Sequence, residues 1–265
     1  MSGIFCSVRQ LSVTYGRGKN NAAAALDGID LDIAVGERLA VIGESGSGKS
    51  TLARALTGLL PEGTEVAGEM VWPALGHPPR PGRDFGFVFQ DPGTSLNPVL
   101  TIGEQIAEGA RRHLGVSWKQ AFLRAEELLE RVRIPQPGKA MRAFPHQLSG
   151  GQRQRVAIAA AIAARPALLI ADEATSALDV VVQAEIVRLL DGLVREDGMT
   201  LLFITHDIAL ASAFVDRIAV FRDARLVEAG PVRSVVSAPE SSYTAALIAS
   251  HRDLATLPLI SEVAP

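Results

Sequence analysis

The sequence has 265 residues, of which 48% are hydrophobic, so it is long enough for one large domain or two small ones around a packed core. Its formal net charge is −3 and no block of like charges occurs, which argues against a nucleic-acid-binding surface or a polybasic membrane-binding segment. The one cysteine, Cys6, excludes an internal disulfide framework and a cysteine-rich metal site, and we expect it to be a small buried apolar residue.

The sequence shows no targeting or membrane-spanning segment. Residues 1–10 lack a basic stretch followed by a long apolar one, so no signal peptide is expected. The most apolar window, 156–171, is interrupted by Arg165 and Pro166 before it reaches membrane-spanning length. We therefore expect a soluble, cytoplasmic chain unless a partner holds it at a membrane.

The N-terminal part predicts antiparallel β-structure. Residues 7–15 and 26–33 alternate apolar and polar side chains, as half-buried strands do, with a turn expected at 16–20. Tyr15 ends the first of these strands. An aromatic ring in that place can stack on a nucleotide base, although a half-buried strand tyrosine is the ordinary interpretation without a phosphate site nearby.

Residues 43–51 read GESGSGKST and fit the phosphate-binding loop pattern of Gly, four residues, Gly-Lys-Ser/Thr. An apolar run at 38–42 precedes the loop and helical spacing at 51–56 follows, so a helix N-terminus would face the phosphates. Backbone amides would surround a polyphosphate, Lys49 would reach the β and γ phosphates, and the Ser50 hydroxyl would bind Mg²⁺. The predicted nucleotide-binding residues of the loop are Gly43, Glu44, Ser45, Gly46, Ser47, Gly48, Lys49, Ser50 and Thr51.

The middle of the chain predicts a short edge strand at 66–72, whose partner the sequence does not assign, and a strand at 85–89. The second strand ends on Gln90, an uncharged amide that can contact Mg²⁺ or water only when nucleotide is bound, which suits a sensor. From 102 to 133 apolar residues fall at helical intervals until Pro135, which predicts an all-helical insertion in an α/β domain.

A second glycine-containing turn, at 147–155, precedes an Ala-rich helix at 156–164. Ser149, Gly150 and Gly151 form a helix start whose free N–H groups would stabilise an anion. The continuously apolar run 167–171 predicts a buried parallel strand that ends on Asp172 and Glu173. Asp172 is placed to hold Mg²⁺ through water and Glu173 to polarise an attacking water, the ordinary alternative being a helix cap and a solvated acid.

The last third predicts a helix at 181–193, a buried strand at 200–205, a hairpin of 217–221 with 224–228, and a helix at 243–250 before a loosely held tail. His206 follows the buried strand, at the sheet edge where open α/β folds place their sites. It could hydrogen-bond the γ-phosphate, although a lone histidine is more often structural.

Taken in order, these motifs resemble the ATP-binding subunit of ABC transporters over nearly the whole chain. Three single residues match: Tyr15 resembles the base-stacking aromatic, Gln90 the Q-loop glutamine and His206 the switch histidine. Four segments match as well: residues 43–51 resemble Walker A, residues 148–152 the signature, residues 168–173 Walker B with its carboxylate, and residues 176–179 the D-loop. The resemblance implies an α/β fold: a P-loop NTPase (RecA-like) core with an N-terminal antiparallel β subdomain and an all-helical insertion carrying the signature motif. It divides one domain, 1–265, into a core (1–90 and 156–235), a helical subdomain (91–155) and a tail (236–265).

The resemblance also implies cofactors and partners. ATP and Mg²⁺ are the expected cofactors, with Ser50, Gln90 and Asp172 as metal ligands, partly through water, and Glu173, His206, Lys49 and Gln90 as the catalytic residues. The expected partners are a second ATP-binding subunit in a head-to-tail dimer, two transmembrane permeases and an extracytoplasmic solute-binding protein, at the cytoplasmic face of the inner membrane and without nucleic acid. In the dimer, the residues expected to complete the partner's site in trans are Ser149, Gly150, Gly151 and Gln152.

Within ABC proteins, 89–98 and 176–184 resemble the peptide and nickel importer branch, and 241–244 resembles its His-Pro-Tyr-Thr motif. Ala174 stands where these proteins usually carry Pro, and the tail is short, as in nickel and metal-chelate importers. The sequence leaves open whether the substrate is a peptide or a metal chelate, and whether the dimer is a homodimer or a heterodimer. A soluble ABC-type ATPase of DNA repair, chromosome organisation or translation is the alternative, but the long coiled coil or second ATPase domain of those proteins is missing. A phosphate-loop kinase or GTPase leaves 149–152 and His206 without a role.

Overall fold

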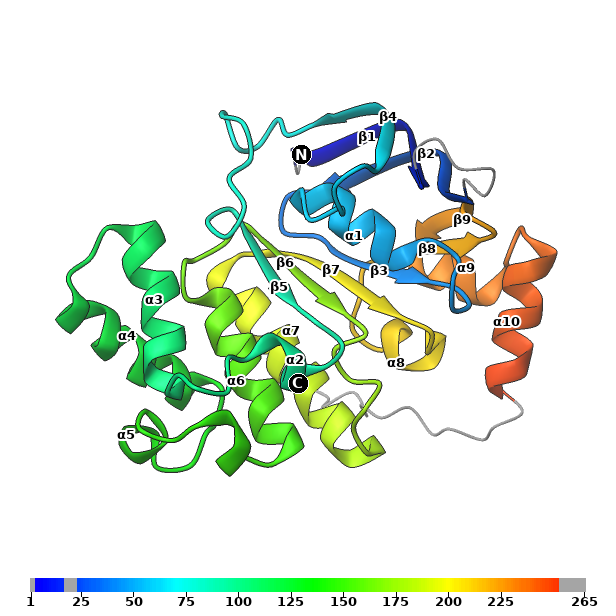
Figure 1. Cartoon of the computed structure of the whole chain (residues 1–265). Coiled ribbons are helices and arrows are strands. Elements are labelled where there is room, and N and C mark those ends of the chain that lie inside the picture. The colour runs from blue at the N-terminus through cyan, green and yellow to red at the C-terminus, as the bar shows by residue number, and fades with distance from the viewer. Residues whose placement is uncertain (1–2, 17–22, 253–265) are drawn as a thin grey trace. The chain divides into compact units, whose positions relative to one another are not determined.

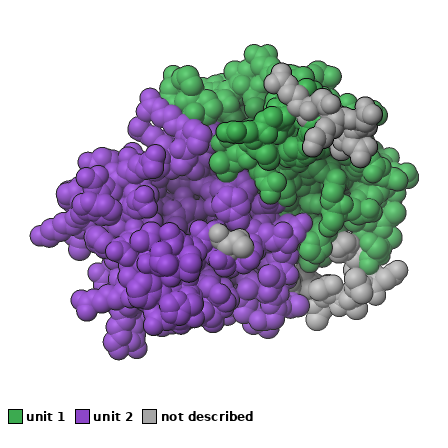
Figure 2. Space-filling model, in the orientation of Figure 1, with its two compact units in different colours: residues 1–79, 200–265 green, residues 80–199 purple. Residues whose placement is uncertain are grey.

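The computed structural model describes residues 3–16 and 23–252, and the chain divides into two compact units (Figures 1 and 2). Unit 1 comprises Met1–Pro79 and Thr200–Pro265, and unit 2 comprises Arg80–Met199. Among the described residues, no helix combines the length and the apolar character that crossing a bilayer requires.

Unit 1 begins with an antiparallel sheet of β1 (Ile4–Tyr15), β2 (Ala23–Ala34) and β4 (Glu65–Val71) in the order β2-β1-β4. The predicted antiparallel opening is therefore confirmed, and the strand left without a partner pairs with β1. Cys6 and Val8 are buried before Gln10, and Leu11 and Val13 after it, so the alternation of β1 changes phase at Gln10, which has a φ of 48° and lies at a register shift, as in a β-bulge. Cys6 is fully buried as predicted, and burial raises the pKa of its thiol to about 12.

The second sheet of unit 1 has β3 (Arg38–Ile42) between β7 (Thr200–Thr205) and β8 (Arg217–Arg222), both parallel to it, while β9 (Arg225–Pro231) pairs antiparallel with β8. β3 is buried on both faces, as its continuous apolar run requires. Helix α1 (Lys49–Thr57) follows β3, and α8 (Ile208–Ser212) follows β7. The described chain ends with α9 (Val232–Ser237) and α10 (Ser242–Arg252).

Unit 2 contains β5 (Phe85–Val88) and β6 (Leu168–Asp172), paired in parallel. Between these strands the chain forms helices without an intervening strand, and α7 follows β6. The helices are α2 (Pro92–Ser95), α3 (Ile102–Leu114), α4 (Trp118–Arg131), α5 (Pro137–Ala140), a 3₁₀ turn (Pro145–Gln147), α6 (Gly150–Ile162) and α7 (Val180–Asp197). Helices α3, α4 and α6 pack on one another through their apolar faces, so the predicted helical region forms around its own core.

Gly86 is the point at which β5 approaches α6. A Cβ atom at Gly86 would lie 2.5 Å from the backbone oxygen of Ala161 and 3.1 Å from Cδ1 of Leu169. The Gly86→Ala variant is therefore expected to lower the free energy of unfolding by about 1–3 kcal/mol, because the backbone of α6 must shift. Denaturant titration measures this change.

Gly192, inside α7, supplies the matched control. No atom lies within 4 Å of the position that its Cβ would take. Gly192→Ala is expected to raise the free energy of unfolding by about 0.5–1 kcal/mol, since alanine has the higher helix propensity. If both variants changed stability in the same direction, the close approach of β5 and α6 would not be the cause.

Candidate nucleotide-binding site

The predicted phosphate-binding loop joins the end of β3 to the start of α1 in unit 1. β3 ends at Ile42, which pairs with Thr205 of β7 and with Val220 of β8, so the loop leaves the sheet from its central strand. α1 begins at Lys49, with Gly48 as its N-cap in the left-handed region. The strand, loop and helix order that the sequence predicted is confirmed, and the positive end of the α1 dipole faces the loop.

Lys49 is folded back onto the loop that contains it. Its Nζ donates to the backbone oxygen of Gly43 at 2.8 Å and to that of Glu44 at 2.7 Å, and the residue is buried. Gly43 itself has no room for a side chain, because a Cβ there would lie 2.1 Å from the backbone oxygen of Phe221 in β8. The ammonium group and the helix N-terminus together concentrate positive charge in the loop, as an anion site requires.

Two other predicted residues of unit 1 lie beside the loop. Tyr15 ends β1, and its hydroxyl lies 3.2 Å from Oγ1 of Thr51 in the first turn of α1. His206 directly follows Thr205, the residue that pairs with Ile42, so His206 and Gly43 leave neighbouring parallel strands at the same sheet edge. His206 is exposed, and the next residue, Asp207, caps α8 by accepting the N–H of Leu210. Unit 1 therefore brings together the tyrosine, the loop and the histidine.

Unit 2 places three predicted residues at the carboxyl ends of β5 and β6. Val88 pairs with Ala171, so Gln90 and Glu173 each stand two residues beyond a paired position, on neighbouring strands. Asp172 is the last residue of β6 and only 6% exposed, whereas Glu173 is half-buried and Gln90 exposed. The amide and the two carboxylates thus share one edge of unit 2.

Glu173 has an unusual backbone conformation. Its φ is 46°, in the left-handed region that non-glycine residues rarely adopt. Its carbonyl oxygen accepts the backbone N–H of Ser176 at 3.1 Å and the hydroxyl of Ser176 at 3.0 Å, which closes a tight turn directly after β6. Strain of this kind is held only where surrounding contacts enforce it, and it fixes the direction in which the carboxylate leaves the strand.

The predicted signature segment begins α6 with a reciprocal cap. The Ser149 hydroxyl accepts the N–H of Gln152 at 3.3 Å, and Gln152 Oε1 accepts the N–H of Ser149 at 2.9 Å. A Cβ at Gly151 would lie 3.1 Å from Cγ1 of Val182 in α7, so the small residues let the two helix starts approach. Ser149 and Gly150 are exposed, which leaves this start accessible to a ligand.

A cavity of about 180 Å³ in unit 2 connects the Q-loop, signature and D-loop segments. Two donor atoms nearby, Nε of Arg153 and Nε2 of Gln154, are buried without a hydrogen-bond partner among the described residues. Sequence reasoning missed this arrangement because only folding brings the three segments together. Its lining residues are Gln90, Asp91, Pro92, Gly93, Gly150, Arg153, Gln154, Ala174, Ala177 and Leu178.

The residues fit the predicted cofactors. The loop presents Glu44, Ser45 and Gly46 to the outside, and a Cβ at Gly46 would meet no atom within 4 Å, so there is open space above the loop for a phosphate. Oγ of Ser47 is buried without a hydrogen-bond partner among the described residues. The predicted metal ligands, Ser50, Gln90 and Asp172, all carry the hard oxygen donors that Mg²⁺ prefers.

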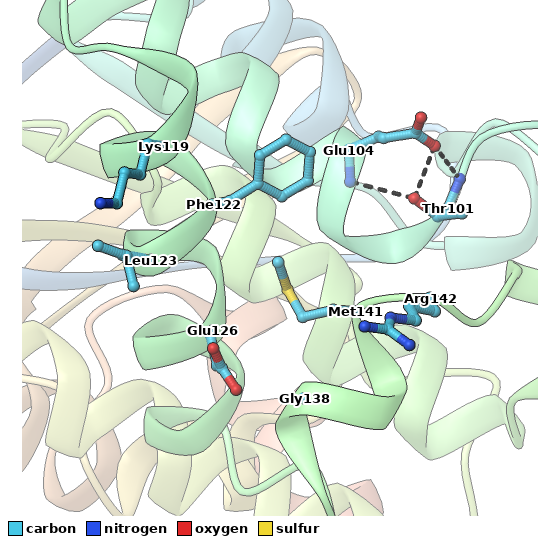
Figure 3. A pocket seen from close by; sticks show the side chains of 9 residues that line it. All are labelled: Thr101, Glu104, Lys119, Phe122, Leu123, Glu126, Gly138, Met141 and Arg142. Atoms are coloured by element: carbon cyan, nitrogen blue, oxygen red, sulfur yellow. Dashed lines mark hydrogen bonds between the residues drawn. The ribbon is translucent and has the colours of Figure 1, made fainter.

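A larger pocket, of about 630 Å³, lies among α3, α4 and the segment after α5 in unit 2 (Figure 3). Helix α4 contributes Phe122, Leu123 and Glu126 to the lining, and the segment after α5 contributes Met141 and Arg142 (Figure 3). Glu104 is tied to Thr101, whose hydroxyl and backbone N–H lower the pKa of that carboxyl. None of the predicted nucleotide-binding residues lines this pocket.

One residue that contacts the phosphate loop in the structure was not predicted from the sequence. Tyr243, in α10, accepts the backbone N–H of Glu44 through its hydroxyl at 3.3 Å. The only sequence signal was the resemblance of 241–244 to a motif of the importer branch, which carried no role. A contact over 199 positions has no local pattern from which to predict it.

The chain matches the protein family described as ABC transporter over residues 26–176. It is 44% identical over 254 residues to the peptidoglycan transport ATP-binding protein YejF of Agrobacterium fabrum, covering 92% of this chain and 46% of that protein. It is 41% identical over 268 residues to the glutathione import ATP-binding protein GsiA of Escherichia coli K12, covering 94% of this chain and 42% of that protein. The chain thus spans less than half the length of these curated relatives.

Solved structures give the same result for the fold. The ATP-binding cassette MJ0796, a dimer bound to ADP and phosphate in a post-hydrolysis state, superposes with a TM-score of 0.72 at 30% identity, over 86% of this chain and 99% of that one. CbiO1 of Clostridium perfringens, part of the ABC transporter complex cbiONQ, superposes with a TM-score of 0.73 at 28% identity, over 90% and 92%. The predicted α/β fold of a P-loop NTPase is confirmed. The chain belongs to the ABC transporter family.

Proposed function

We propose that the chain is an ATP-hydrolysing subunit that powers uptake of a small solute through partner membrane permeases. The observation that carries this proposal is that the sequence contains one Walker A motif, while the described residues include two helix starts suited to phosphate, at Lys49 in unit 1 and at Gly150 in unit 2. A nucleotide site could be built from the Lys49 helix start of one chain and the Gly150 helix start of a second chain. A head-to-tail dimer of ATP-binding subunits gives both starts a role.

In this proposal each predicted residue has a defined task. The loop amides and Lys49 bind the phosphates, and Tyr15 stacks on the base. Ser50, Gln90 and Asp172 bind Mg²⁺, which when bound neutralises part of the phosphate charge. Glu173 accepts a proton from the attacking water, and His206 holds the γ-phosphate in line. The residues that complete the partner's site are Ser149, Gly150, Gly151 and Gln152.

The relatives favour one class of solute. YejF is named for peptidoglycan transport and GsiA for glutathione import, and both names describe compounds that contain peptide bonds. We infer a peptide-type substrate. Nickel or a metal chelate, the other class that the sequence predicted, stays a prediction. A role in DNA repair or translation gains no support from these names.

The remaining partners follow from the proposed transport. Two permeases would carry the solute across the membrane, a solute-binding protein would deliver it from outside the cell, and the chain would lie at the cytoplasmic membrane face as a peripheral subunit. Closure of the dimer on ATP and its opening after hydrolysis would drive the permeases between two states. The division into a core, a helical subdomain at 91–155 and a tail from 236 also stays a proposal.

Mixing two inactive variants tests whether the signature acts in trans. Lys49→Ala removes one chain's phosphate contact, and Ser149→Arg blocks the signature of the other. Each variant alone is expected to hydrolyse ATP at least about a hundredfold more slowly than the wild type. A mixed dimer contains one intact site, so an equal mixture should recover about a quarter of the wild-type turnover if chains pair at random.

Phosphate release in the presence of Mg²⁺ measures this turnover, and removal of Mg²⁺ with a chelator is expected to abolish it. The control is Lys49→Ala alone at the total protein concentration of the mixture. If the two variants together were as inactive as each alone while the wild type hydrolysed ATP, each site would be built from one chain, and the proposed dimer would be wrong.

A further inference from the structure

The contact between α10 and the phosphate loop lies entirely within unit 1 and has no role in the function proposed so far. Tyr243 in the first turn of α10 accepts the backbone N–H of Glu44, the second residue of the loop. This hydrogen bond joins the phenol oxygen to the protein backbone, and the Glu44 carboxylate also interacts with the same hydroxyl, which adds to the effect of burial in raising the pKa of Tyr243.

The N–H of Glu44 and the carbonyl of Gly43 belong to the same peptide unit. The carbonyl accepts Nζ of Lys49 at 2.8 Å, while the N–H donates to the Tyr243 hydroxyl. In a trans peptide these two groups point in opposite directions, so Lys49 and Tyr243 hold one planar unit from its two sides. Loss of the hydroxyl would free this plane to rotate and would move the acceptor that holds the lysine.

Tyr243 is itself held in place. The guanidinium of Arg222, the last residue of β8, lies 4.9 Å from the centre of its ring, and its backbone N–H donates to the Ser241 hydroxyl at 3.2 Å. The Glu228 carboxylate in β9 accepts the N–H groups of Glu240 and Ser241 at 3.0 and 3.1 Å. The turn before α10 is therefore anchored to the β8–β9 hairpin, and the tyrosine is not a freely rotating surface side chain.

The surroundings of Tyr243 keep it as a neutral hydroxyl. Its pKa is raised, chiefly by burial, so the phenol stays protonated at neutral pH. α10 also contacts α8, the helix that begins just after His206. One C-terminal helix therefore contacts both the start of the phosphate loop and the helix next to the predicted switch histidine.

We propose that Tyr243 is a positioning residue of the phosphate loop: its hydroxyl fixes the peptide unit between Gly43 and Glu44 and thereby the carbonyl that holds Lys49. The inference rests on the proposed ATP-binding function. It gives the segment 241–244 a physical task, which is to connect α10 to the nucleotide site.

The Tyr243→Phe variant removes the hydroxyl and keeps the ring over which Arg222 lies. The KM for ATP, and the Kd measured by calorimetry, are expected to rise about three- to tenfold, the range for loss of one hydrogen bond. The kcat at saturating ATP is expected to stay within about twofold, because the hydroxyl holds a peptide unit of the loop in both the ground state and the transition state. Ser250→Ala, which removes an exposed hydroxyl from the same helix, is the control and should change neither constant.

Amide hydrogen exchange of Glu44, measured by NMR on the full chain without nucleotide, reports the contact directly. Exchange at Glu44 is expected to be about tenfold faster in Tyr243→Phe and unchanged in Ser250→Ala. Equal ATP affinity in wild type and Tyr243→Phe would overturn the inference whatever the exchange rate, and so would an equal fall in kcat and in kcat/KM. A wild type that binds no ATP would overturn the proposed function instead, and the exchange of Glu44 would still decide whether Tyr243 holds the loop.

Discussion

The Glu173→Gln variant is expected to hydrolyse ATP about 10²–10⁴-fold more slowly than the wild type while it still binds ATP. The amide has nearly the shape of the carboxylate but cannot accept a proton from water. Glutamine also places no new demand on the left-handed backbone at this position, where φ is 46°. The change therefore removes the chemistry of the side chain and leaves the turn after β6 in place.

Single-turnover phosphate release measures the chemical step, and calorimetry with ATP measures binding. The control is Glu185→Gln in α7, which makes the same chemical change at an exposed carboxylate paired with the half-buried Arg155. That variant is expected to lose at most about 1 kcal/mol of stability and no turnover, because a partly exposed ion pair contributes little. Unchanged turnover in Glu173→Gln would exclude this carboxylate as the general base.

Glu173→Gly separates catalysis from stability at the same position. Glycine adopts a positive φ without strain, so the free energy of unfolding is expected to rise by about 1 kcal/mol while hydrolysis is lost. If Glu173 served mainly to make structural contacts, Glu173→Gly would instead lower the free energy of unfolding. Thermal unfolding of Glu173→Gln and Glu173→Gly under the same conditions makes the comparison.

The elements that the sequence predicts are those whose signal is local. The apolar run at 38–42, followed by GESGSGKST, predicted β3, the loop and the start of α1, and the structure has all three in that order. The apolar strands at 167–171 and 200–205 were predicted for the same reason, since burial on both faces leaves an unbroken apolar run. Each was found within one residue of its predicted bounds.

The features that the sequence did not predict depend on long-range contacts. The change of phase at Gln10 breaks the alternation of β1, and β4 is mostly exposed, so its pairing with β1 left no apolar pattern to read. Helices α8 and α9 have five and six residues, too few for a helical period to show. The turn predicted at 16–20 falls mainly outside the described residues, as does the tail beyond 252.

For the site, the sequence identified residue types but not how they are supported. It selected Glu173 from its place after an apolar strand, but its strained backbone and the turn closed by Ser176 are properties of the folded chain. Likewise, the pattern that selected Lys49 contains nothing about Tyr243, which holds the other side of the same peptide unit. The roles of these residues in binding and hydrolysis stay predictions that the variants test.

Gly48→Ala is expected to weaken ATP binding strongly and to lower the free energy of unfolding by about 2–5 kcal/mol. Gly48 has a φ of 105°, and a Cβ there would lie 2.5 Å from the backbone oxygen of Ala25 and 2.9 Å from Cδ2 of Leu26. To avoid these short contacts the loop has to move away from β2, and this movement displaces Lys49 and the first N–H groups of α1. We expect the Kd for ATP to rise at least about a hundredfold, which corresponds to about 2.7 kcal/mol.

Gly36→Ala provides the control for backbone strain alone. Gly36, between β2 and β3, has a φ of 71°, and its Cβ would meet no atom within 4 Å. It should lose about 1 kcal/mol of stability and bind ATP as the wild type does, because the strain is the same in kind but the loop is untouched. Equal losses of stability in the two variants would show that strain, and not the approach of β2, is the cause. Normal ATP affinity in Gly48→Ala would mean that this loop does not bind the phosphates, and the proposed nucleotide site would be wrong.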